Sequence, residues 1–113
     1  QYPVYAFFSS VSGLKTGAKI EMVGVQIGMV SKVNIDKERL LAKVELSIDK
    51  NIELSEDVIA SVKTSGIIGQ KYIDIQPGGS DIILGPGEEI FNTESSLDIE
   101  SLVRKLIFIK NNK

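Results

Sequence analysis

Serine, lysine and the carboxylates are the main side chains of this sequence that could do chemistry, because histidine and cysteine are absent. Their absence excludes His/Cys zinc sites, Ser-His-Asp triads, Cys-His pairs, iron–sulfur clusters and disulfides. Glu88–Glu89 and Asp98–Glu100 bring carboxylates together, but without the spacing of a calcium-binding EF-hand loop. Nothing in the sequence places a Ser-Lys pair as nucleophile and base. We therefore expect no enzyme, no resident metal and no cofactor.

A glycine motif, Gly66-Ile67-Ile68-Gly69, has the G-x-x-G form of the loop with which KH domains clamp RNA. That loop requires helices on both sides, whereas strand-like segments flank it here. The chain carries 13 basic and 15 acidic residues, a net charge of −2, without the basic surplus of a nucleic-acid binder. The motif is interpreted as a tight turn between strands, and no nucleic-acid partner is expected.

Three large apolar residues, Ile82, Ile83 and Leu84, interrupt a segment of turn-forming residues between 77 and 87. One interpretation is a short buried strand. The other is an apolar loop tip, which forgoes about 2 kcal/mol of burial free energy for each side chain. Proteins tolerate such a tip where it meets a partner, a lipid or further copies of the same chain. The pattern alone leaves both interpretations open.

Isoleucine and valine are abundant and apolar residues alternate along many segments, which predicts short strands. These strands must position the residues described above. The clearest alternation predicts that Leu40, Ala42, Val44, Leu46 and Ile48 point inward. Closely spaced strands with glycine turns indicate a small all-β barrel or sandwich. The predicted strands are 2–8, 20–23, 25–35, 40–48, 58–62, 72–76 and 88–91.

After residue 94 the spacing of apolar residues changes from alternation to a helical repeat. We therefore divide the chain into a β-barrel domain at 1–94 and a C-terminal helix and tail at 95–113. Apolar residues from Ile99 to Ile109 recur at helical spacing, after a capping-box pattern at Ser95 and Asp98. This amphipathic helix could pack on its own core. Its last turn is apolar nearly all round, which favours other subunits or a membrane protein. The candidate assembly residues are Leu102, Val103, Leu106, Ile107 and Ile109.

Three glycine-containing motifs follow one another along the chain, at 13–17, 20–30 and 64–73. They are similar to the patterns G-L-K-x-G, V-x-x-x-G-V-x-V-G-x-V and T-x-G-L-L-G-x-x-Y. In this order and spacing they resemble the MCE (mammalian cell entry) domain family, and most closely its single-domain, MlaD-like members. The glycines interpreted as structural turn residues are Gly13, Gly17, Gly24, Gly28, Gly66 and Gly69.

The resemblance implies a fold and a function. The fold is a seven-stranded MCE β-barrel, here with a short C-terminal amphipathic helix. Members assemble as homohexameric rings, and an apolar loop lines the pore; this assigns Ile82, Ile83 and Leu84 as pore-lining, lipid-contacting residues. The implied protein is periplasmic, is held in the inner membrane by an anchor expected before this chain, and moves phospholipid with ABC permease and ATPase subunits and a lipid carrier. The alternative is a monomeric β-barrel that binds an apolar ligand or a host surface, with Ile82–Leu84 in its core.

Overall fold

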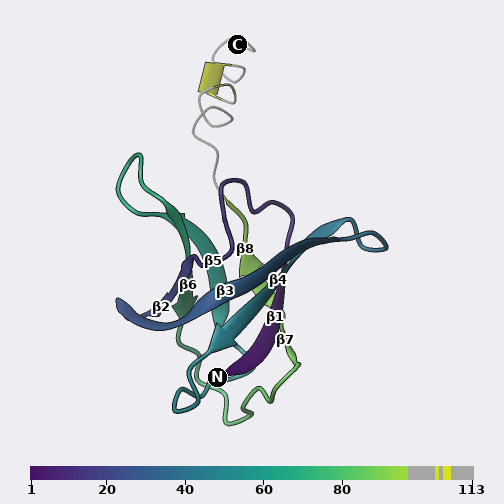
Figure 1. Ribbon diagram of the computed structural model, residues 1–113, viewed down its shortest axis with the longest axis vertical. Helices are drawn as coiled ribbons and strands as arrows, with labels where there is room; N and C mark the ends of the chain where they lie inside the picture. Colours follow the sequence, from purple (N-terminus) through teal and green to yellow (C-terminus); the bar gives the residue numbers. More distant parts are fainter. Residues whose placement is uncertain (97–103, 105, 108–113) are drawn as a thin grey trace.

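Eight strands form one sheet in the computed structural model, which describes residues 1–96, 104, 106 and 107 (Figure 1). Among these residues no helix is long and apolar enough to cross a membrane. The strands are β1 (Tyr2–Phe8), β2 (Lys19–Met22), β3 (Val25–Asp36), β4 (Leu41–Ile48), β5 (Ile59–Thr64), β6 (Lys71–Gln76), β7 (Glu89–Ile90) and β8 (Asn92–Glu94).

The sheet curls into a nearly closed barrel. Its strand order is β7-β1-β4-β3-β2-β6-β5-β8, so the two edge strands are consecutive in the chain and only Phe91 separates them. β7 pairs with β1 and β8 pairs with β5, both in parallel, so this short segment bridges the two edges. The predicted all-β barrel is confirmed. The seven predicted strands correspond to β1–β7, and the structure adds β8.

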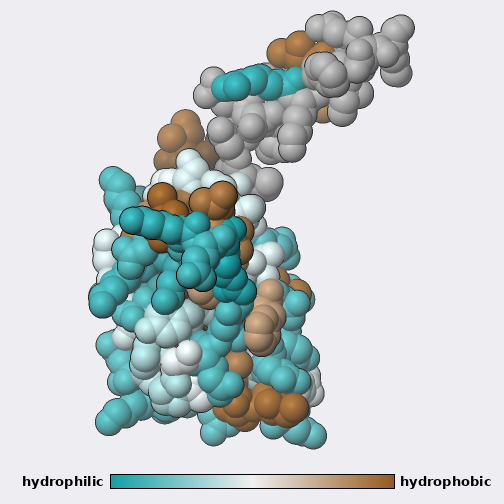
Figure 2. Space-filling model, turned by 90° about the vertical axis from the view of Figure 1, so that its right-hand side faces the viewer, coloured by the Kyte–Doolittle hydropathy of each residue, from teal (hydrophilic) through white to brown (hydrophobic). Residues whose placement is uncertain are grey.

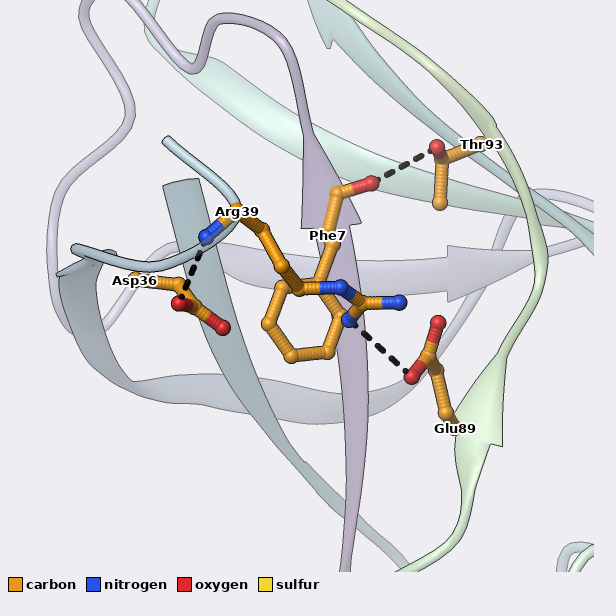
Figure 3. Close-up of polar contacts among 5 residues, drawn as sticks. All are labelled: Phe7, Asp36, Arg39, Glu89 and Thr93. Atoms are coloured by element: carbon orange, nitrogen blue, oxygen red, sulfur yellow. Dashed lines mark hydrogen bonds and ion pairs between the residues drawn. The ribbon is translucent and has the colours of Figure 1, made fainter. Parts of the chain in front are cut away.

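Residues 89–94, which we call the closing segment, are joined by side-chain and backbone contacts to β1 and to the β3–β4 turn (Figure 3). The Thr93 hydroxyl donates a hydrogen bond of 2.8 Å to the Phe7 carbonyl oxygen. The Arg39 guanidinium lies 4.1 Å from the centroid of the Phe7 ring and 3.3 Å from a Glu89 carboxylate oxygen. Asp36 accepts the Arg39 backbone N–H at 3.1 Å, which holds the turn in place. We call these five residues the seam.

The barrel core consists of apolar side chains from alternate strand positions, as the period of two requires. Val44, Leu46 and Ile48 on β4 are fully buried, as the alternation predicts. The inward prediction for Leu40 is wrong: its side chain is 79% exposed. Leu40 precedes β4 and has a φ of 53° in the turn, so it does not follow the alternation of the strand.

Candidate functional site

The β6–β7 loop, residues 77–88, carries the three predicted pore-lining residues and lies against residues 54–56. Ile83 forms an isolated antiparallel bridge with Ser55, and the Leu84 N–H donates to the Leu54 carbonyl at 2.8 Å. This pairing turns Leu84 into the core, where it is 6% exposed. Ile82 and Ile83 stay 60% and 45% exposed. The loop therefore combines both interpretations of the sequence: Leu84 is buried, and its two neighbours present an apolar surface.

Asp57 holds the first part of this loop. Its carboxylate accepts the backbone N–H groups of Gly79 at 2.9 Å and Ser80 at 3.1 Å. These bonds and one with the Ser55 side chain stabilise the charged form, and the Gly79 bond contributes most; together they lower the pKa of Asp57 from 3.8 to about 2. A Cβ atom on Gly78 would lie 2.0 Å from the Asp57 carboxylate, so glycine is needed for this close approach. The loop is thus anchored as well as paired.

A second apolar surface lies at the β5–β6 tip, residues 65–70. Ile67 and Ile68 are 82% and 96% exposed, and Ile68 is the most exposed of the large hydrophobic side chains that the structure describes. The Ser65 N–H donates to the Gln70 carbonyl at 3.0 Å and closes the tip. A Cβ atom on Gly69 would lie 1.6 Å from the Ser65 carbonyl oxygen, so the tip can close only with glycine there. The segment connects β5 to β6, as the turn interpretation predicts.

Sequence reasoning missed the outward direction of Ile67 and Ile68. A signal was present: two adjacent large apolar residues between glycines cannot both reach a core from a tight turn. Burying an isoleucine is worth about 1.5–3 kcal/mol, so the monomer forgoes a substantial free energy at this tip. The β5–β6 tip is therefore a candidate contact surface on the same grounds as Ile82 and Ile83.

The two apolar surfaces lie at opposite ends of the barrel. In Figure 1 the β5–β6 tip projects at the upper left, and the β6–β7 loop runs along the bottom beside the N-terminus. The side that carries the β3–β4 turn is mostly hydrophilic, with separate apolar patches (Figure 2). Exposed apolar side chains of the β3–β4 turn and the closing segment are Ile35, Leu40 and Phe91.

The remaining predicted residues have different places. Of the six glycines, Gly13, Gly17, Gly24 and Gly66 have positive φ angles, and a Cβ atom on Gly28 would lie 2.1 Å from the Ser47 carbonyl oxygen of β4. Among the assembly residues, Leu106 and Ile107 are exposed. Leu102, Val103 and Ile109 lie outside the described residues, and so does most of the predicted helix.

Comparisons with known proteins agree with this fold. The family model described as MlaD protein matches residues 1–78. The chain is 34% identical over 111 residues to the intermembrane phospholipid transport system binding protein MlaD of Haemophilus influenzae, and 29% identical over 113 residues to that of Escherichia coli K12. These alignments cover 95% of the chain and 66% and 62% of the two relatives, so the chain spans just under two thirds of their lengths.

A solved structure gives the same result in three dimensions. A chain of the Acinetobacter MlaFEDB complex in an ATP-bound conformation superposes with a TM-score of 0.85 at 27% identity. The superposition covers 93% of this chain and 80% of the solved one. The family model spans more than half of the sequence, and the β-barrel and its glycine turns are those that the motifs predict. The chain therefore belongs to the MlaD family of MCE-domain proteins.

Proposed function

We propose that this chain is a lipid-binding, non-catalytic component of an ABC-type phospholipid transport system. The names of the curated relatives, which are binding proteins of an intermembrane phospholipid transport system, support a transport role. The observation that carries the proposal is the β5–β6 tip, where Ile67 and Ile68 are 82% and 96% exposed. Side chains that already lie outside the core can contact acyl chains without any unfolding of the barrel.

The proposal includes a homohexameric ring, as the MCE resemblance implies. Cyclic symmetry places the same tip of every subunit at one distance around the axis, and we propose that the tips face the axis. A ring of isoleucines there gives acyl chains an apolar path and is a barrier to ions. The tail residues proposed to join neighbouring subunits are Leu102, Val103, Leu106, Ile107 and Ile109.

The proposed partners and location follow from the same relatives. The structural match belongs to an ATP-bound MlaFEDB complex, which supports permease and ATPase subunits as partners of this chain. The energy for transport then comes from the ATPase. We place the barrel in the periplasm, as a domain of a protein anchored in the inner membrane, where it exchanges phospholipid with a lipid carrier.

The β6–β7 loop is the second candidate for the lipid path. Ile82 and Ile83 face outward beside a hollow of about 190 Å³ that Tyr2, Ile52 and Leu84 help to line. Leu84 is buried in the single chain and supports the loop from beneath. The loop is held by Asp57 and by its pairing with residues 54–56, so it offers a fixed surface at the opposite end of the barrel.

Two matched double variants separate these surfaces: Ile67→Ser with Ile68→Ser, and Ile82→Ser with Ile83→Ser. Native mass spectrometry from mild detergent counts subunits and bound phospholipids in the same spectrum. We expect the first pair to lose bound phospholipid at least about tenfold, since two apolar contacts per subunit are removed, while the second pair keeps it. Circular dichroism checks that both variants keep the β-sheet fold.

The opposite result, with lipid lost only in the Ile82/Ile83 variant, would assign the path to the β6–β7 loop. A monomeric wild-type chain whose lipid content neither variant changes would refute the proposal. It would favour the monomeric barrel that binds another apolar ligand or a host surface.

A further inference from the structure

A groove at the end of the barrel that carries the β5–β6 tip collects three lysines. Two adjoining hollows, of about 350 and 400 Å³, share Gly17, Ala18, Gln70 and Lys71 in their walls. Lys19 and Glu21 line the first hollow, and Lys15 and Thr16 line the second. We call the two hollows together the lysine groove.

Backbone hydrogen bonds and side-chain packing fix both walls of the lysine groove in the chain without a ligand. The Gly17 N–H donates to the Val30 carbonyl at 2.8 Å, and the Val30 N–H donates to the Ala18 carbonyl at 2.9 Å, which fixes the β1–β2 connection on β3. On the other wall, a Cβ atom on Gly13 would lie 3.1 Å from Cγ of Lys71, so the connection packs on the lysine stem. The Lys71 ammonium donates to the Thr64 hydroxyl at 2.6 Å. A preformed groove loses little conformational entropy on binding.

The charge of the groove is opposite to that of the whole chain. Among the described residues that line the groove, Glu21 is the only carboxylate, against the exposed Lys15 and Lys19 and against Lys71, whose ammonium is already held by Thr64; the chain as a whole carries −2. Lys15 and Lys19 have exposed side chains, and Thr16 and Gln70 add a hydroxyl and an amide. Ammonium groups with neutral donors form the charge-assisted hydrogen bonds that suit a phosphate. The groove is therefore fitted to a small phosphate-bearing anion.

The groove and the apolar tip share residues. Ser65 and Gln70 line the groove and are also the two ends of the β5–β6 tip, with Ile67 and Ile68 between them. An amphipathic molecule can therefore meet cations and isoleucines within one short segment of the barrel. We propose that the lysine groove binds the phosphate of a phospholipid headgroup while the β5–β6 tip contacts its acyl chains. This inference deepens the proposed function. Contact of the acyl chains with the β5–β6 tip rests on that proposal, whereas phosphate binding by the lysine groove does not.

The test is a ¹⁵N NMR titration of the chain with three probes: short-chain phosphatidylglycerol below its micelle concentration, glycerol phosphate and inorganic phosphate. We expect the short-chain lipid to shift amides of residues 13–19 and 65–72 saturably. Glycerol phosphate should shift the groove amides more weakly and leave Ile67 and Ile68 unmoved. Lys15→Gln and Lys19→Gln should each weaken lipid binding about tenfold, and Lys37→Gln, an exposed lysine of the β3–β4 turn, should not.

The other outcomes decide separately on the headgroup site and on the apolar tip. Unchanged lipid affinity in both lysine variants, or no saturable shift at 13–19, would overturn it. Binding of inorganic phosphate as tightly as the lipid would make this a free-phosphate site. Ile68→Ser distinguishes the two proposals: loss of lipid binding there, with wild-type affinity in the lysine variants, would leave the proposed function standing and the headgroup site refuted. Loss of glycerol phosphate and lipid binding in the lysine variants, with none in Ile68→Ser, would support the groove and refute the apolar tip.

Discussion

Asp57 is the residue through which acid acts on the β6–β7 loop. Its carboxylate accepts the N–H groups of Gly79 and Ser80, chiefly that of Gly79, and its pKa falls from 3.8 to about 2. Because the folded pKa is the lower one, the stabilisation is fully present above the unfolded value and is lost as the pH falls through the folded value. We therefore expect the loop to loosen between about pH 4 and pH 2. The amide resonances of Gly79 and Ser80 should shift with a midpoint near 2 in an NMR titration.

The matched control for this titration is Asp57→Asn, which keeps the shape of the side chain and removes its charge. The low-pH shift of the Gly79 and Ser80 amides should disappear in this variant. If the same shift persists in Asp57→Asn, another carboxylate is responsible and Asp57 does not hold the loop.

At the scale of the element, Leu84 and Ile82 test how the β6–β7 loop is built. Leu84→Ala should lower the free energy of unfolding by about 2–4 kcal/mol, because the side chain is 6% exposed in the core and its loss leaves a cavity. Ile82→Ala should change it by less than about 0.5 kcal/mol, because that side chain is 60% exposed. Urea denaturation of the two variants measures both values. Equal losses would mean that the loop does not divide into a buried anchor and an exposed surface.

The local spacing of apolar residues predicted the long strands. It did not predict elements whose position depends on contacts with residues far away in the sequence. Val44, Leu46 and Ile48 alternate along β4, so their burial could be predicted from a period of two. β8 could not be found this way: its sequence, Asn92–Glu94, is polar, and its position depends on pairing with β5. The burial of Leu84 likewise depends on pairing with Leu54.

In the candidate site, too, some features could be predicted from the local sequence and others depend on distant contacts. The glycines around Ile67 and Ile68 marked a turn, but which way the two isoleucines point depends on the finished hairpin. The lysine groove left no trace in the sequence pattern. Lys15 and Lys71 are far apart in the chain, and only the packing of the β1–β2 connection on β6 brings them together.

For the whole molecule, closure of the barrel depends on the segment after Phe91. β8 covers the free edge of β5, where Ala60 pairs with Thr93, and the Ser96 N–H donates to the Ser10 carbonyl at 3.0 Å. Ending the chain after Phe91 removes these contacts and leaves β5 as an open edge. At about 1 kcal/mol for each net hydrogen bond, we expect the free energy of unfolding to fall by about 2–4 kcal/mol.

The matched control is a chain that ends after Ser96, which keeps β8 and its contacts with β5 and with Ser10. Its midpoint in urea should equal that of the full chain, since it keeps the pairing of β8 with β5 and the hydrogen bond from Ser96 to Ser10. Thr93→Val refines the comparison: it deletes the 2.8 Å bond to the Phe7 carbonyl and should cost about 1 kcal/mol, with β8 still paired. If the chain ending after Phe91 were as stable as the one ending after Ser96, closure by β8 would contribute nothing. The barrel would then be held by its six inner strands and β7 alone, and the contacts of Arg39 with Phe7 and Glu89 would stabilise only the β3–β4 turn.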